Sequence, residues 1–414
     1  MIRYRAIGGL LAIGVLSGGV IAAPGMAGAA GTCAPAGRTG AANNWPQKLL
    51  DPDAAWPFAK GDGVRIAVVD SGVDAGQPTL SGRVEPGFNA VIGHGRADSD
   101  CAGTGTQVAG AIAASATSGT GINGTAPRAT IVPVRVTGQP NRSTDGVVPP
   151  GVLARGINWA VQQRVEVIDV APVLYQDDDR VRIAIAAAVA AGIVVVAPAG
   201  GLGSANDGNP TPYPAAYPDV IGVTAIDPDG MPWTSAGHGD FVDLAAPGVA
   251  VAAVQRTRGW VAVTASTAVA AGYVSGVAAL VRDRWRHLSA GQVRDRLIGA
   301  ATPDAGAGPG LVNAYASVTD DLVYRKPPRP QALTRPTVSA AERAHRAAAA
   351  DSRRLAIMFT VAGLGVLLIV TLVAVGLPRA RRRGWRPAYA APLPRPSDGD
   401  EPAPPRLLFE DVPG

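Results

Sequence analysis

Five apolar runs constrain the fold of this chain more than any other feature. Each run is nearly continuous in apolar residues and rich in β-branched side chains, without the alternation of a half-exposed strand. Strands that are buried on both faces of a parallel sheet have this composition. The runs lie at 63–70, 129–136, 165–171, 192–199 and 220–227.

Helical patterns separate these runs. Between the predicted strands, apolar residues recur at helical spacing in 105–115, 151–164 and 179–192. Strands that alternate with helices favour a mainly parallel, twisted sheet with helices on both faces, so we expect an α/β fold. A later helix is expected from Ser289, which forms the pattern of a capping box with Gln292.

Residues 1–30 have the features of a secretory signal peptide. Arg3 and Arg5 supply positive charge, an apolar stretch follows, and small residues at 27–30 offer a cleavage site. An uncleaved anchor is the alternative. Under either interpretation, the main domain at 31–320, which includes an N-terminal extension, lies outside the cytoplasm.

A second apolar segment, 355–377, contains no charged residue. As a helix it would span roughly 34 Å, which is enough to cross the hydrocarbon core of a bilayer. Arg353 and Arg354 precede it, and a larger arginine cluster follows it within 379–386. Because such residues favour the cytoplasmic side, we expect a single-pass membrane protein with a cytoplasmic C-terminus.

The segments on either side of the predicted membrane helix have biased compositions. Residues 321–354 are rich in Pro and Arg and then in Ala, which is typical of a linker. Residues 378–414 are rich in Pro and are expected to form a disordered cytoplasmic tail.

The chain has two cysteines, Cys33 and Cys101. In an exported protein such a pair indicates a disulfide, with two free thiols as the alternative. The closed loop is long, so the bond would stabilise the fold by about 4 kcal/mol. It would tie the N-terminal extension to the segment just before Thr104.

Charge and composition exclude several classes of function. The net charge of +5 comes mainly from arginine, and no basic patch is interleaved with aromatic residues. Nucleic-acid binding is therefore not expected. No spacing of His, Cys, Asp or Glu indicates a metal site, and we expect no cofactor.

Six stretches in a fixed order resemble motifs of the subtilisin-like serine proteases, peptidase family S8. The resemblance covers residues 45–316 and implies a subtilisin-like fold. The stretches read AVVDSGVD, GTGTQVAG, GINGTAPRATIVPVRV, TPYPAAYPDVIGVTAID, DFVDLAAPG and TASTAVAAGYVSGVAALVR.

The layout of the whole chain resembles one branch of that family, the mycosins. These are membrane-anchored subtilases of type VII secretion systems in actinobacteria. The shared features are a secretory signal, an N-terminal extension that carries a cysteine, the opening WPFAKGDGVRIAVVDSGVDA, a Pro-rich linker and one C-terminal membrane helix. The resemblance implies association with a type VII secretion membrane complex.

The resemblance also places four functional positions of a subtilase on this chain. The catalytic Asp falls on Asp70 and is retained. The catalytic His falls on Thr104, the catalytic Ser falls on Ala268, and the Asn of the oxyanion hole falls on Gly201. Three of these positions therefore lack the side chain that the family's mechanism uses.

Each change removes a distinct chemical role. Ala268 has no nucleophile, and the Thr104 hydroxyl is too weak a base to accept a proton near neutral pH. Gly201 has no side chain, and an oxyanion donor is worth roughly 3 kcal/mol. Loss of the Ser or His of such a triad costs on the order of 10⁶ in rate. Asp169 and Ala171 stand where the family has Asn and Ser, which alters the substrate cleft further.

Three hypotheses follow. The leading one is a catalytically inactive mycosin-like pseudoprotease, a structural or stabilising membrane subunit whose partners are type VII secretion components and other mycosin copies. The second is an active serine endopeptidase with a rearranged site that uses Ser266 and His94. The third is a peptide-binding module that uses the former substrate cleft.

Overall fold

The computed structural model describes residues 33–115, 120–137, 148–203, 207–303 and 310–320. All of them fall within the first of two units of the chain, Met1–Thr334. The predicted signal peptide (1–30), linker (321–354), membrane helix (355–377) and tail (378–414) lie outside the described residues. Within the described ranges, no helix combines the length and the apolar character needed to cross a membrane.

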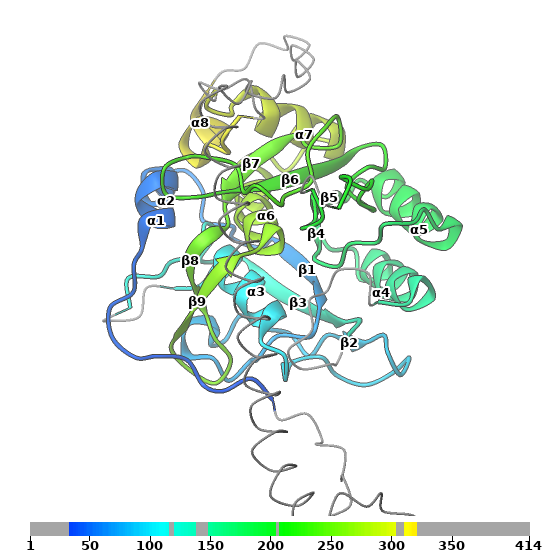
Figure 1. Cartoon of the computed structure of the whole chain (residues 1–414), viewed down its shortest axis with the longest axis horizontal. Helices are drawn as coiled ribbons and strands as arrows, with labels where there is room; N and C mark the ends of the chain where they lie inside the picture. Colours follow the sequence, from blue (N-terminus) through cyan, green and yellow to red (C-terminus); the bar gives the residue numbers. More distant parts are fainter. Residues whose placement is uncertain (1–32, 116–119, 138–147, 204–206, 304–309, 321–414) are drawn as a thin grey trace, which may run out of the picture. The chain divides into compact units, whose positions relative to one another are not determined.

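A parallel seven-stranded sheet forms the centre of the domain (Figure 1). Its strands neighbour one another in the order β2-β3-β1-β4-β5-β6-β7. The five predicted strands are confirmed and occupy the five inner positions, where both faces of a strand are buried. The bounds are β1 Arg65–Asp70, β2 Phe88–Asn89, β3 Thr130–Arg135, β4 Val167–Val170, β5 Val194–Pro198, β6 Val220–Ile226 and β7 Leu244–Pro247.

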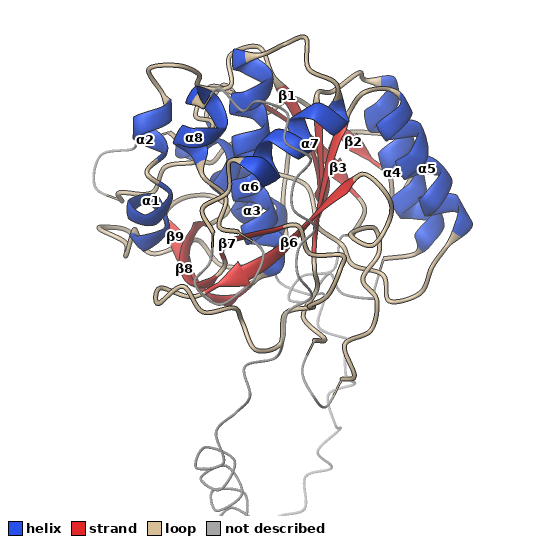
Figure 2. Ribbon diagram, turned by 90° about the horizontal axis from the view of Figure 1, so that it is seen from above, coloured by secondary structure: helices blue, strands red, loops and turns tan. Residues whose placement is uncertain are grey.

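Helices cover both faces of this sheet, as expected (Figure 2). Helices α4 and α5 pack on one face with their own buried apolar cluster, and α3 and α6 pack on the other. The bounds are α1 Trp45–Leu50, α2 Pro52–Ala55, α3 Thr104–Ala113, α4 Pro150–Gln162, α5 Asp179–Ala190, α6 Thr267–Arg284, α7 Ala290–Gly299 and α8 Ala314–Thr319, with the 3₁₀ helix η1 at Pro78–Leu80.

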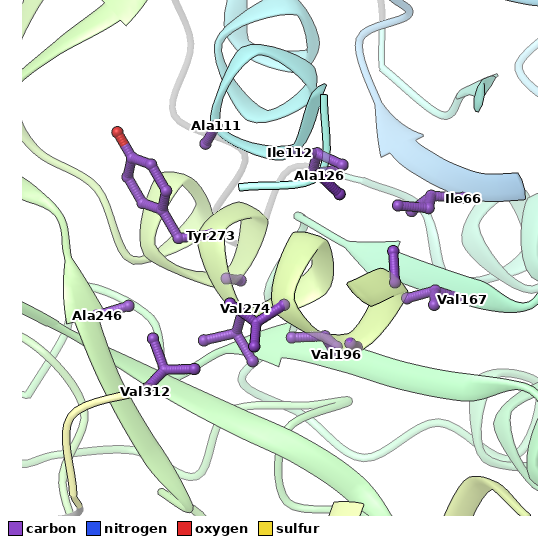
Figure 3. Close-up of a cluster of buried hydrophobic side chains, with 14 of the residues drawn as sticks. Ile66, Ala111, Ile112, Ala126, Val167, Val196, Ala246, Tyr273, Val274 and Val312 are labelled. Atoms are coloured by element: carbon purple, nitrogen blue, oxygen red, sulfur yellow. The ribbon is translucent and has the colours of Figure 1, made fainter. Parts of the chain in front are cut away.

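Helix α6 runs through the larger of the two apolar clusters. Nearly all of its residues are buried, which is why the sequence of this helix is apolar on every side. Tyr273 and Val274 of α6 lie in the same cluster as Ile112 of α3 and Val196 of β5 (Figure 3). The burial fixes α6, and with it the residues at its N-terminus.

Helix α7 begins with the predicted capping box. The side chain of Ser289 accepts the Gln292 N–H, and the side chain of Gln292 accepts the Ser289 N–H. These two bonds satisfy backbone donors that the helix itself leaves without partners.

An antiparallel hairpin of β8 (Val249–Val254) and β9 (Trp260–Ala265) leads into α6. The N-terminal extension lies against this hairpin, because Arg38 and Trp260 exchange backbone hydrogen bonds of 2.8 and 3.0 Å. Cys33 and Cys101 are joined by a disulfide, which links the extension to the loop just ahead of α3.

Candidate functional site

The four positions taken from the subtilase motifs meet at one cavity. Asp70 is the last residue of β1, and Thr104 is the first residue of α3. Ala268 lies in the first turn of α6, and Gly201 follows β5. The cavity has a volume of about 260 Å³, and its lining consists of Asp70, Thr104, Gln107, Val108, Ala171, Gly201, Trp233, Val263, Ala265, Ser266, Thr267, Ala268 and Val269.

The topology of the sheet explains this meeting point. Parallel strands have their carboxyl ends at one edge of the sheet, where ligands of open α/β folds bind. The N-terminus of α3 lies directly against the loop after β1. A Cβ atom at Gly105 would lie only 2.0 Å from the carbonyl oxygen of Gly72, so this contact requires glycine.

Thr104 joins Asp70 to a buried network of hydroxyl groups. Thr104 Oγ1 lies 2.7 Å from Asp70 Oδ1 and 2.9 Å from Ser71 Oγ. Ser71 Oγ lies 2.8 Å from Asp100 Oδ1. The side chains of Thr104 and Ser71 therefore form a chain of two hydroxyl groups between two buried carboxyl groups, since Asp70 is 1% and Asp100 2% exposed.

The two carboxyl groups differ in their hydrogen-bond donors. Asp70 Oδ1 accepts the Thr104 hydroxyl at 2.7 Å and the Ser71 N–H at 2.6 Å. Asp100 accepts the Ser71 hydroxyl (2.8 Å), the N–H groups of Gly103 (2.7 Å) and Thr106 (2.9 Å) and the Thr106 hydroxyl (2.7 Å). Because Asp70 has fewer donors, we expect it to hold a proton more readily than Asp100.

The electrostatics of Asp70 agree with this expectation. Burial raises the pKa of Asp70 to about 7, and the negative charge of Asp100 adds to the rise. Hydrogen bonds from Thr104 and Ser71 act in the opposite direction. In a Ser-His-Asp triad, by contrast, the carboxylate stays ionised because it faces an imidazole. The carboxyl group of Asp70 faces a hydroxyl group instead.

Sequence reasoning missed Asp100. The Gly103 that precedes α3 has no side chain, and Asp100 provides the acceptor for the first N–H groups of this helix. An acidic residue just ahead of a predicted helix is a recognised cap signal, and the stretch DSDCAGT carries it. Asp100 thus organises the helix that positions Thr104.

The N-terminus of α6 brings hydroxyl groups near Ala268 without a neighbouring base. Ser266 is the N-cap residue, and its Oγ accepts the N–H of Val269 at 3.2 Å. The cavity lining includes Ser266 and Thr267 but no histidine. The side chain of Ser266 therefore acts as the N-cap of helix α6.

The structure does not bring His94 and Ser266 together in a hydrogen bond or a shared cavity within the described ranges. His94 lies in an exposed loop, where its Nδ1 contacts the carbonyl oxygen of Ile92 at 3.1 Å. The cavity that contains Ser266 does not include His94.

Gly201 contributes only its backbone to the site. Its N–H donates to Tyr175 Oη at 3.1 Å, so a tyrosine hydroxyl accepts the backbone donor there. The cavity wall at this position thus has no amide side chain that could donate to an oxyanion.

A third buried carboxyl group belongs to the central sheet. Asp169 of β4 is fully buried, and its Oδ2 lies 2.6 Å from the Ser275 Oγ of α6. Its Oδ1 has no hydrogen-bond partner among the described residues. Burial raises the pKa of Asp169 to about 7, and the charge of Asp70 adds a smaller rise. This carboxyl group and Ser275 form a polar contact between the central sheet and the central helix.

The fold and the arrangement around Asp70 define a class of protein. A family model described as the subtilase family matches residues 61–320, and the chain belongs to this family. Over 283 residues, the chain is 35% identical to thermitase of Thermoactinomyces vulgaris, covering 66% of this chain and 94% of that protein.

Within the family, the chain is a homologue of the mycosins. It is 33% identical over 339 residues to Mycosin-1 of Mycobacterium tuberculosis, covering 69% of this chain and 74% of Mycosin-1. The crystal structure of MycP1 from the ESX-1 type VII secretion system matches with a TM-score of 0.61 and 26% identity, covering 73% and 93% of the two chains. The MycP3 protease from the ESX-3 system matches with a TM-score of 0.57 and 30% identity, covering 70% and 92%. These matches confirm the predicted subtilisin-like fold.

Proposed function

We propose that this chain is a catalytically inactive mycosin-like subtilase that acts as a structural or stabilising membrane subunit of a type VII secretion system. One observation carries the proposal. In the cavity where the functional positions of a subtilase meet, Asp70 is hydrogen-bonded to the Thr104 hydroxyl, and Ala268 presents no nucleophile.

The chemistry of the cavity supports inactivity. Acyl transfer in this family uses a serine that is activated by an imidazole, with a donor for the developing oxyanion. Thr104 cannot act as that base, because its hydroxyl is already part of the chain from Asp70 to Asp100. The network satisfies the polar groups that remain after the loss of a histidine, which is expected of a site kept for stability.

Retention of the scaffold supports a role in an assembly. The inner strands and the central helix α6 are packed as a regular core. The proteins that match this chain include MycP1 of an ESX-1 system and MycP3 of an ESX-3 system. Membrane anchoring through 355–377, with the subtilase domain outside the cytoplasm and the C-terminus inside, is part of the proposal and rests on the sequence.

Co-purification tests the assembly. The tagged full chain is expressed in its own host, and membranes are solubilised in mild detergent. We expect recovery of type VII secretion membrane components. A matched variant with an unrelated membrane helix in place of 355–377 should recover the same components if the subtilase domain makes the contact. Recovery of the chain only as a monomer would contradict the proposal.

An endopeptidase with a rearranged site is the first alternative, and it requires Ser266 to react. Ser266 lines the cavity, which keeps this alternative testable, but its hydroxyl caps α6. A fluorophosphonate probe, followed by peptide mass mapping, is expected to leave the full chain unlabelled. Labelling at Ser266 that disappears in Ser266→Ala and His94→Ala variants would establish the alternative.

A peptide-binding module is the second alternative, and the remaining cavity beside Asp70 favours it. Its lining combines apolar side chains with Trp233 and Gln107, which suits a peptide side chain. Crosslinking from a photoreactive residue at Gln107 would detect a bound segment. Absence of any crosslinked peptide in purified secretion complexes would rule this alternative out.

A further inference from the structure

A second cavity, of about 400 Å³, lies beside the hydroxyl chain and shares no lining residue with the first. It is formed by the loop after β1, the loop ahead of α3, the end of β3 and the turn after β8. Its lining consists of Cys33, Ser71, Asp74, Asn89, Val91, Ile92, Ser99, Asp100, Cys101, Arg135 and Arg256.

Arg135 is held in this cavity by backbone carbonyl groups. Its Nε donates to the carbonyl oxygen of Ser71 at 3.0 Å, and its Nη2 donates to the carbonyl oxygen and, at 2.9 Å, to the Oγ of Ser99. Among the described residues, Nη1 has no hydrogen-bond partner and the guanidinium forms no ion pair. The side chain is therefore fixed while part of its donor capacity stays available.

Arg256 is held in the same manner. Its Nε donates to the carbonyl oxygen of Asp100 at 2.7 Å, and its Nη1 donates to the carbonyl oxygen of Ala34 at 2.7 Å. Within the described ranges, Nη2 has no partner and no carboxylate pairs with the group. Two guanidinium groups are thus oriented in advance, which lowers the entropy lost when they bind a ligand.

The two carboxyl groups of the cavity have protein donors already. Asp74 accepts the N–H of Gly76 at 2.9 Å on Oδ1 and the N–H of Thr257 at 2.6 Å on Oδ2. Asp100 caps α3, as described above. Within the described ranges, the polar groups of the cavity walls that lack a partner are therefore guanidinium N–H donors of Arg135 and Arg256. A ligand that binds them must supply acceptor oxygens.

The rim of the cavity is apolar and exposed. Val91 is 44% and Ile92 58% exposed, and they lie in the loop that follows β2. A free inorganic anion would leave these side chains in water. A segment with a carboxylate next to an apolar side chain would satisfy the arginines and cover the rim at the same time. Nucleic acid does not fit, because the lining has no aromatic side chain on which a base could stack.

We propose that this cavity is a docking site for a short peptide segment of a partner protein that carries an acidic side chain beside an apolar residue. Arg135 and Arg256 hold the carboxylate, and Val91 and Ile92 contact the apolar side chain. Bidentate contacts between guanidinium groups and a carboxylate are among the stronger polar interactions available to proteins. The site gives the subtilase domain a means of recognition that does not involve Asp70 or Ala268.

Calorimetric titration of the full chain in detergent micelles tests this proposal. The probes are acetyl-Leu-Asp-Leu amide, acetyl-Leu-Asn-Leu amide and inorganic phosphate, at low ionic strength. We expect binding of the Asp peptide, and at least tenfold weaker binding of the Asn peptide and of phosphate. Equal affinity for the Asp and Asn peptides, or phosphate binding as tight as that of the Asp peptide, would overturn the proposal.

Substitutions locate the site. Arg135→Gln and Arg256→Gln should each weaken binding of the Asp peptide about tenfold or more, and Arg135→Lys should weaken it less. Arg258→Gln is the matched control, because this exposed arginine lies in the same hairpin turn but outside the cavity lining. Thermal unfolding of each variant shows whether it is folded. Unchanged affinity in a folded Arg135→Gln variant would refute the site, whatever the outcome of the co-purification.

Discussion

The hydroxyl of Thr104 lies 2.7 Å from Oδ1 of Asp70, at the position to which the motif resemblance assigns the catalytic histidine of a subtilase. The contact begins a chain of hydroxyl groups that ends at Asp100. It changes the protonation of Asp70, the stability of the site and the chemistry available there. Each of these consequences can be measured.

Restoring the missing side chains should restore reactivity. In the variant Thr104→His, Ala268→Ser, Gly201→Asn, all three substitutions lie around one cavity with Asp70. We expect labelling by a fluorophosphonate at position 268. The matched variant with only Ala268→Ser should react at least about 100-fold more slowly, because it lacks the base. A folded triple variant that stays unlabelled would show that the backbone of the site has changed as well.

The two carboxyl groups of the hydroxyl chain should respond oppositely to amidation. Asp70→Asn resembles the protonated acid, so it should change the free energy of unfolding by no more than about 1 kcal/mol near pH 7. Asp100→Asn removes a carboxylate that accepts from four donors and should cost about 2–4 kcal/mol. Thermal unfolding of the purified chain measures both, with exposed Asp229→Asn as the control. A larger loss in Asp70→Asn than in Asp100→Asn would refute the expectation that Asp70 is the carboxyl group that holds a proton more readily.

Stability should fall as the pH rises from about 4 to about 7. Asp70 and Asp169 have folded-state pKa values of about 7, above the usual value near 3.9, so the folded state holds their protons more tightly. Their contribution is complete below pH 4 and is lost by about pH 7, at up to ~1.4 kcal/mol per pH unit for each group. The melting temperature is therefore expected to be higher at pH 5 than at pH 8.

Two comparisons isolate this effect. The variant Asp70→Asn, Asp169→Asn should lose the fall in melting temperature between pH 5 and pH 8. Asp98, Asp177 and Asp178 have lowered pKa values because of their arginine partners, so their contributions are lost only as the pH falls through the acid range below 4. A double variant with an unchanged pH profile would exclude Asp70 and Asp169 as its cause.

Removal of the disulfide should destabilise the domain and release its N-terminal extension. Cys33 and Cys101 are 68 residues apart, and closure of a loop of this length is worth about 4 kcal/mol in the chain-entropy account. A Cys33→Ser, Cys101→Ser variant should unfold at lower temperature and lose residues 33–40 to limited proteolysis. Addition of reductant should shift the wild type in the same direction and leave the variant unchanged. If the variant and the wild type resist the protease equally, the contacts between Arg38 and Trp260 are enough to hold the extension without the disulfide.

The sequence alone predicted the inner part of the sheet, because strands buried on both faces must be continuously apolar. It did not predict the edge strands β2 and β7. Phe88–Asn89 and Leu244–Pro247 are short, and their pairing depends on a neighbouring strand rather than on a pattern of their own. The order of motifs likewise predicts the four functional positions, since each motif is local in sequence.

The tertiary structure determined which contacts these positions make. Thr104 contacts a carboxyl group 34 residues away, and the arginine that fixes one wall of the second cavity bonds to a carbonyl group 156 residues away. No local pattern encodes such contacts, because they arise only when the loops after β1 and β8 meet at the start of α3. The sequence determined the scaffold and predicted which functional positions differ from the family. Packing decided that burial raises the pKa of Asp70 to about 7 and that Arg135 and Arg256 line the same cavity.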